Sequence, residues 1–340
     1  LYRPPVRPRP FRRHPQARAQ RRDQAAGDRR AGHDAGDDVR AADLHRAARA
    51  AQAARRARPG RGVLAVSALR SGDFSSPGDD NSPEDAEGRR AGPRRAGDGL
   101  EDEVTWQDVE CGSYAADLVL WSQLAREAAG PVLELGAGCG RVALRLAAEG
   151  GEVTALDHSA ALVAELERRA GARGLELETV VAGAGDFRLD RKFAAIIAPM
   201  QLLHLLGGAP GRARMLVRAR AHLAPGGALA AALLAERPGP PAPGAPPPLP
   251  DVAERDGWVY SSLPLEVRPL AGALEVRRLR QVVAPSGELS EEVDAVRLDP
   301  LDPDRFEAEA AAVGLRARER LAVAATDDHV GSVVCVLEVA

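Results

Sequence analysis

The chain has 340 residues, of which 46 are Lys or Arg and 49 are Asp or Glu, and its formal net charge is −3. This near balance predicts no general attraction to nucleic acid or to a membrane. The three cysteines are widely spaced and form no C-x-x-C pair, so they indicate neither a disulfide framework nor a zinc site and fit a reducing cytoplasm. No apolar run approaches the roughly 18 residues that a membrane-spanning helix needs.

Residues 1–100 differ in composition from the rest of the chain. They are rich in Arg, Ala, Pro and Gly and contain only one short apolar run. Such a segment buries too little apolar surface to offset its ordering entropy, so we expect a disordered tail. A nucleic-acid-binding arm or an arginine-rich targeting peptide are the alternatives, and interspersed aspartates weaken both.

A folded domain is predicted over residues 101–340. Helical spacing over 114–129 is followed by strands that alternate with helices. The strands are expected at 131–135, 152–156, 175–181, 193–198 and 228–234, and the helices at 141–149, 159–170 and 211–223. This alternation predicts a parallel sheet covered by helices on both faces.

The pattern changes after a proline-rich linker, 237–250. Antiparallel strands are expected at 258–262, 265–269, 274–283 and 291–297, with a bulge or uneven burial in the third. A helix over 303–313 and two strands, 315–322 and 332–339, complete the chain.

A glycine loop follows the first of the alternating strands. Gly136, Gly138 and Gly140 stand at alternate positions, and Glu134 precedes them by two residues. Glycines let a backbone turn sharply and approach a ligand, and the helix that follows offers unpaired N–H groups. The G-x-G-x-G spacing differs from the G-x-G-x-x-G of dinucleotide folds. A tight turn without a ligand is the alternative interpretation.

Acidic residues follow the next two strands. Asp157 lies about 20 residues after the glycine loop, where a carboxylate can accept hydrogen bonds from both ribose hydroxyls. Asp186 and Phe187 lie in the loop after the third strand, facing the adenine edge of such a ligand. The alternatives are an aspartate at a helix N-terminus and a plain surface turn. A fourth buried strand ends at Ala198, at the same edge of the sheet.

In this order, the motifs resemble those of class I S-adenosylmethionine-dependent methyltransferases over residues 101–340. The resemblance implies a Rossmann-like α/β fold, with a seven-stranded, mostly parallel sheet whose last strand is antiparallel. It also implies an antiparallel β insertion, residues 237–299, that serves as a substrate cover or a dimer surface. Trp258 and Tyr260 either line a pocket there or pack the added sheet. The substrate expected is a small molecule, because the Asn/Asp-Pro-Pro-aromatic motif of base-methylating enzymes is absent.

The resemblance also implies the residues that hold S-adenosylmethionine. The glycine loop would hold its methionine part, Glu134 would orient the loop or the amino group, Asp157 would bind ribose, and Asp186 would bind the adenine amino group. The full set is Tyr114, Glu134, Gly136, Ala137, Gly138, Gly140, Asp157, His158, Asp186, Phe187 and Ala198. No metal is expected.

Two histidines are candidates near the reacting atoms, and two aromatic residues lie on the preceding helix. His204 follows the fourth strand and is the candidate general base, or else a histidine packed in an apolar turn. His329, before the last strand, is a second polar candidate. Tyr114 and Trp121 lie on the helix before the first strand, and the resemblance implies that this region forms a lid over cofactor and substrate. Tyr114 is the candidate lid residue, with simple helix packing as the alternative.

Two other classes of function stay open at this stage. An NAD(P)-dependent oxidoreductase shares the strand, glycine loop and acid, but the glycine spacing is against it. A Tyr-x-x-x-Lys pair is absent because Lys192 is the only lysine and Arg188 stands four residues before it. A non-catalytic cofactor-binding or nucleic-acid-binding protein is the other alternative.

Overall fold

The computed structural model describes residues 102–236, 247–326 and 329–340, and all of these belong to one compact unit. The tail predicted over residues 1–100 lies outside the described residues. So do residues 237–246 of the linker predicted over 237–250.

A seven-stranded sheet forms the core of the described residues. In order across the sheet, its strands are β10 (Leu315–Val323), β11 (Ser332–Val339), β5 (Leu223–Leu234), β4 (Phe193–Ala198), β1 (Val132–Leu135), β2 (Val153–Asp157) and β3 (Glu178–Val181). β11 runs antiparallel to both of its neighbours, while β1 to β5 pair in parallel. The predicted mostly parallel sheet with an antiparallel last strand is confirmed.

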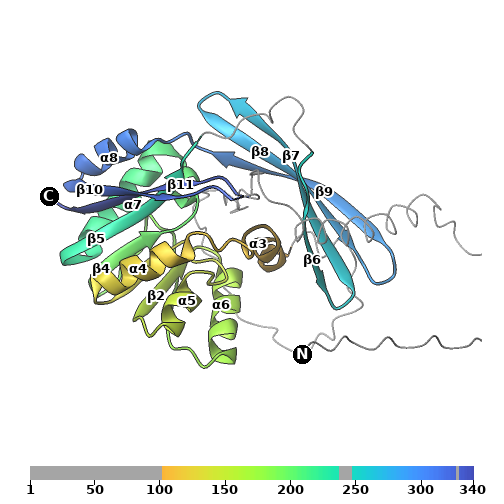
Figure 1. The fold of residues 1–340 in the computed structure, drawn as a ribbon, viewed down its shortest axis with the longest axis horizontal. Helices are drawn as coiled ribbons and strands as arrows, with labels where there is room; N and C mark the ends of the chain where they lie inside the picture. Colours follow the sequence, from red (N-terminus) through yellow and green to blue (C-terminus); the bar gives the residue numbers. More distant parts are fainter. Residues whose placement is uncertain (1–101, 237–246, 327–328) are drawn as a thin grey trace, which may run out of the picture. The chain divides into compact units, whose positions relative to one another are not determined.

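Helices cover both faces of this sheet (Figure 1). α4 (Leu118–Ala128), α5 (Ala143–Ala148) and α6 (Ala160–Ala172) pack on one face, and α7 (Gly208–His222) and α8 (Pro303–Ala311) pack on the other. Along β1, Val132 faces the first group and Leu133 and Leu135 face the second. Each such side chain, fully buried, stabilises the fold by about 1.5–3 kcal/mol.

The strand order reverses at β1, which pairs with β2 on one side and β4 on the other. Glu134 lies beside Ile197, and Leu135 beside Leu156, so the carboxyl ends of these three strands meet. Ligands of open α/β sheets bind outside such a switch point.

A second, antiparallel sheet contains β6 (Asp251–Arg255), β7 (Trp258–Leu270), β8 (Ala273–Val283) and β9 (Leu289–Leu298), in that order. This confirms the predicted β insertion, with two corrections. The strands predicted at 258–262 and 265–269 form one strand, β7, whose register shifts between Pro264 and Glu266. β6 was not predicted, because it follows the proline-rich segment directly.

The bulge or uneven burial expected in β8 is found only in part, because the register of the β7–β8 ladder shifts at Arg277 and Arg278 while burial along the middle of β8 is regular. Its buried positions alternate regularly from Val276 to Val282, and Arg278 and Arg280 occupy the two between them. The spacing of apolar residues could not predict that Arg278 and Arg280 are buried, because arginine ordinarily faces solvent.

The first two helices of the described residues differ from the prediction. The helix predicted from residue 114 begins at Leu118, after a turn. α3 (Glu103–Cys111) was not predicted, and the side chain of Asp102 caps it by accepting a hydrogen bond from the backbone N–H of Thr105 at 3.1 Å. None of the helices in the described ranges is long and apolar enough to cross a membrane.

Candidate active site

The glycine loop begins where β1 ends, and its three glycines all have positive φ. A Cβ atom on Gly140 would lie 2.2 Å from Cδ1 of Leu166, so this glycine lets the start of α5 approach α6. A Cβ atom on Gly138 would lie 2.8 Å from Nε2 of Gln107, on α3. Gly140 therefore serves helix packing, and Gly138 leaves room above the loop for another group.

Asp157 joins the end of β2 to this loop. Its buried carboxylate accepts hydrogen bonds from the backbone N–H of Gly138 at 2.8 Å and of Ser159 at 3.0 Å. His158 is half-exposed, and its Nδ1 lies 3.1 Å from Oδ1 of Asp157. Ala137, in the loop, donates its N–H to the carbonyl of Leu156 on β2 at 2.9 Å. The structure thus brings the predicted ribose acid and the glycine loop together.

Glu134 is the most unusual carboxyl group of the site. Its side chain is buried, and Oε2 has no hydrogen-bond partner among the described residues. Burial raises the pKa of Glu134 to about 8, although the positive charge of Arg141 opposes this. A buried acceptor without a partner is costly, and a bound ammonium group would satisfy it. This atom fits the expected contact with a cofactor amino group.

A buried ion pair lies beside the loop. The guanidinium of Arg141 donates two hydrogen bonds to the carboxylate of Asp117, at 2.6 and 2.8 Å. The indole Nε1 of Trp121 donates to the same carboxylate at 2.8 Å. Trp121 is fully buried in the core against the sheet, where it packs α4.

Tyr114 lies between two other side chains of this region. Its ring stacks on His329 with centroids 4.6 Å apart, and the guanidinium of Arg141 lies 5.1 Å from its centroid. Two predicted candidates from opposite ends of the domain therefore meet, next to the residue that follows the glycine loop.

The loop after β3 places Asp186 and Phe187 differently. Asp186 is exposed, while Phe187 is buried against His222 with ring centroids 4.7 Å apart. The N–H of Phe187 donates to the carbonyl of Gly183 at 3.2 Å and closes the turn. Ala198 is fully buried at the end of β4.

His204 does not have the environment of a general base. The backbone N–H of Leu234 donates to its Nε2 at 3.2 Å, so Nδ1 carries the proton and donates to the carbonyl of Asp299 at 2.8 Å. His204 is 3% exposed, and burial lowers its pKa. With both nitrogens engaged, the ring ties the loop after β4 to β5 and to the end of β9. The alternative of a packed histidine describes this environment.

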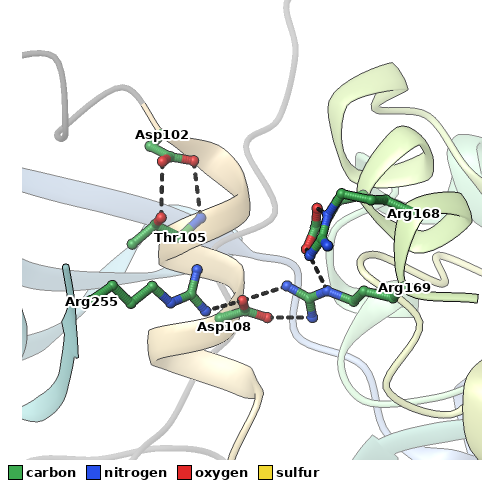
Figure 2. A network of polar contacts seen from close by, with 7 residues as sticks. Asp102, Thr105, Asp108, Arg168, Arg169 and Arg255 are labelled. Atoms are coloured by element: carbon green, nitrogen blue, oxygen red, sulfur yellow. Dashed lines mark hydrogen bonds and ion pairs between the residues drawn. The ribbon is translucent and has the colours of Figure 1, made fainter. Parts of the chain in front are cut away.

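Sequence reasoning missed the part that α3 plays. Its Asp108 carboxylate accepts two hydrogen bonds from Arg169 on α6, at 2.8 and 2.6 Å, and also contacts Arg255 on β6 (Figure 2). Burial raises the pKa of Asp108, but the two arginines outweigh it and hold the pKa below its ordinary value.

Further contacts fix α3 along its length. Glu103 accepts a hydrogen bond from the hydroxyl of Ser159 at 2.7 Å, next to Asp157. Glu110 pairs with Arg280 on β8 at 2.9 and 3.0 Å, which accounts for the buried arginine there. A weak signal for this helix exists in the sequence, namely a capping aspartate before spaced apolar residues.

The aromatic residues of the insertion contact α3. The ring of Tyr260 on β7 meets Trp106 edge to face, with centroids 5.9 Å apart. Trp258 packs against the same cluster. Of the two interpretations of these residues, packing is the one that the contacts support.

A cleft of about 870 Å³ lies beside the glycine loop, between α3, α5 and α6. Gly140 and Arg141 line it, and neither Asp157 nor Asp186 does. It therefore lies on the helix side of the loop, and Gln107 of α3 also lines it. Within the described ranges, no group of three His, Cys, Asp or Glu residues could hold a metal ion.

Comparison with known proteins agrees with this geometry. Residues 132–227 match the family model of the methyltransferase domain. This segment begins at β1 and ends in β5, so it contains the glycine loop, both acids and β4. A search of curated proteins found no match.

Solved methyltransferase structures share the fold. The sugar N-methyltransferase KedS8 from Streptoalloteichus has a TM-score of 0.55 and 18% identity, over 78% of this chain and 99% of its own. DesVI from Streptomyces venezuelae has a TM-score of 0.54 and 20% identity, and the match covers 70% of this chain and 98% of DesVI. An S-adenosylmethionine-dependent methyltransferase from Clostridium acetobutylicum has a TM-score of 0.54 and 12% identity, and the match covers 69% of this chain and 96% of that enzyme. The family match and the fold confirm the predicted resemblance, and nothing here supports the oxidoreductase alternative.

Proposed function

We propose that this S-adenosylmethionine-dependent methyltransferase transfers a methyl group to an amine nitrogen of a small, sugar-like molecule. The observation that carries the choice of nitrogen is the environment of His204, whose two ring nitrogens both make backbone hydrogen bonds. A hydroxyl acceptor must lose a proton to a base, whereas a neutral amine already presents a lone pair. Because both ring nitrogens of His204 make backbone hydrogen bonds, His204 is not available to take a proton from a hydroxyl. An amine is therefore the acceptor that best suits this site.

The residues of the chain have separate tasks in this proposal. Asp157 holds the ribose by accepting hydrogen bonds from its hydroxyls, and Glu134 accepts a hydrogen bond from the ammonium group. Asp186, exposed after β3, accepts from the adenine amino group. When bound, S-adenosylmethionine supplies a methyl group already activated on a sulfonium.

The protein contributes alignment and exclusion of water. β1 and β4 end side by side, so the glycine loop and the loop after Ala198 flank the same space. A Cβ atom on Gly136 would lie 3.1 Å from the side chain of Leu202, which follows β4. An apolar side chain there keeps water from the glycine loop. We infer that the acceptor enters from the side of β6–β9, since the family resemblance implies that this insertion covers the substrate.

The names of two structural neighbours support the choice of acceptor. KedS8 is named a sugar N-methyltransferase, and CalS10 from Micromonospora, at a TM-score of 0.50 and 18% identity, is named an amino pentose methyltransferase. The match covers 99% of the KedS8 chain and 92% of the CalS10 chain.

The test is methyl transfer from isotopically labelled S-adenosylmethionine to a panel of amino sugars. Each amino sugar is paired with the sugar that carries a hydroxyl in place of the amine. Labelling of amino sugars alone is the expected result, and the Asp157→Asn protein serves as the control for cofactor dependence. Labelling confined to the hydroxyl partners would contradict the proposal.

A further inference from the structure

α3 lies directly beside the ribose acid. The hydroxyl of Ser159 donates to Glu103 at 2.7 Å, and the backbone N–H of the same serine donates to Asp157 at 3.0 Å. One residue thus connects the first turn of α3 to the carboxylate expected to bind ribose. Gln107 is four residues after Glu103, so it projects from the same face of the helix one turn further on.

Gln107 touches the glycine loop at the residue that Asp157 holds. A Cβ atom on Gly138 would lie 2.8 Å from Nε2 of Gln107 and 3.3 Å from its Cδ, so a side chain at this position would displace the amide. The N–H of Gly138 in turn donates to Oδ2 of Asp157 at 2.8 Å. The amide therefore lies over the junction of the loop and the acid.

The oxygen of this amide is unsatisfied. Oε1 of Gln107 is buried and has no hydrogen-bond partner within the described part of the chain. A buried acceptor of this kind calls for a donor other than the described residues, because native proteins pair nearly all such groups. Glu134 has a similar unsatisfied oxygen, but a carboxylate suits a cationic donor and a neutral amide suits a neutral hydroxyl.

We propose that Gln107 is a cofactor-positioning residue, whose side-chain oxygen accepts a hydrogen bond from a ribose hydroxyl of S-adenosylmethionine. Asp157 and Gln107 then hold the ribose from two sides, the first from the sheet and the second from α3. Asp108, the next residue of α3, is bound to Arg255 of the insertion. The helix that contacts the ribose is therefore also attached to the sheet on the substrate side. The proposal rests on the cofactor assignment above and adds a residue outside the sequence motifs.

The test compares two ligands. S-adenosylhomocysteine has both the adenosine and the amino-acid part, and 5′-methylthioadenosine has the adenosine alone. Gln107→Met removes the acceptor at similar length, and Gln123→Met is the matched control, because Gln123 is exposed on α4 and bonds Glu127. We expect Gln107→Met to weaken both ligands by a similar factor of about 3 to 10, the value of one neutral hydrogen bond, and Gln123→Met to change neither.

Two results would overturn the proposal. Unchanged affinity of Gln107→Met for both ligands would show that the amide makes no contact with the cofactor. Loss confined to S-adenosylhomocysteine would place the contact on the amino-acid part. If the wild-type protein bound neither ligand, the cofactor assignment would fail before Gln107 came into question.

A second variant separates positioning from folding. Gln107→Glu keeps an acceptor oxygen at the same place, so it should retain the affinity that Gln107→Met loses. The thermal midpoint of each variant without ligand is recorded beside the titrations. Equal loss of affinity in the Glu and Met variants, with unchanged midpoints, would contradict a role as hydrogen-bond acceptor.

Discussion

Gly138 donates its backbone N–H to Oδ2 of Asp157 at 2.8 Å, which fixes the glycine loop against the end of β2. The same carboxylate therefore organises the loop and is expected to bind the ribose. In Asp157→Asn one oxygen remains as an acceptor, but the charge is lost. Because a hydrogen bond to a charged group contributes about 1.5–3 kcal/mol, the affinity for S-adenosylmethionine should fall about 10- to 100-fold.

Calorimetric titration measures this change. Asp190→Asn, an exposed acid in the loop before β4, is the matched control and should bind like the wild type. Equal affinity of Asp157→Asn and wild type would remove Asp157 from the cofactor site.

Cofactor binding should release a proton at neutral pH. Burial raises the pKa of Glu134 to about 8, so this carboxyl is mostly protonated at pH 7 in the free protein. An ammonium group bound against it lowers that pKa and ionises it, which releases about one proton per molecule bound. Titration in buffers of different ionisation enthalpy gives this number directly. Glu134→Gln should release none, and release by that variant would assign the proton to another group.

The same residue sets a pH dependence of stability without ligand. A carboxyl whose pKa rises on folding is disfavoured in its charged form, so it lowers stability as the pH rises from about 4.5 towards 8. Glu134→Gln should therefore be more stable than wild type at pH 8, by a margin that shrinks as the pH approaches 4.5. Denaturant unfolding at both pH values checks the sign. A margin that does not change with pH would contradict the raised pKa.

His204 should prove structural. Its two backbone hydrogen bonds are lost in His204→Ala, at a cost of about 2–3 kcal/mol in the free energy of unfolding. Because burial lowers its pKa, His204 also destabilises the fold as the pH falls below about 6.5, where the unfolded chain takes up the proton. Whatever activity the variant keeps should have the wild-type pH profile. Loss of one limb of that profile, with stability unchanged, would restore the general-base role.

Asp108 should hold α3 in place. In Asp108→Asn the pairs with Arg169 and Arg255 lose their charge, so α3 should open more often and exchange its amide hydrogens faster. The exchange rates of the backbone amides of residues 103–111, compared with those of α4, measure this opening. Glu127→Gln, an exposed residue on α4, is the control and should leave α3 unchanged. Identical exchange of α3 in Asp108→Asn and wild type would show that other contacts suffice.

The sheet and the ligand-facing motifs could be predicted because their signals are local. β1, the glycine loop and Asp157 lie within 26 residues of one another, and each carries its own periodicity or spacing. The buried pair of Glu110 and Arg280 could not be predicted, since 170 residues separate the partners and an arginine in a strand indicates an exposed position. The role of α3 was missed for the same reason, because its meaning comes from distant partners.

His204 shows the other limit of sequence reasoning. Its place after β4 is that of a catalytic group, but the partners of its two nitrogens, Leu234 and Asp299, belong to β5 and to the segment after β9. Position in a motif does not show which side chains are already engaged.

The central claim is that the glycine loop binds S-adenosylmethionine, and one titration tests it most directly. The wild-type protein is titrated calorimetrically with S-adenosylmethionine and, separately, with NADH. We predict saturable binding of S-adenosylmethionine with one molecule per chain, and no heat of binding with NADH. Binding of NADH without binding of S-adenosylmethionine would contradict the account.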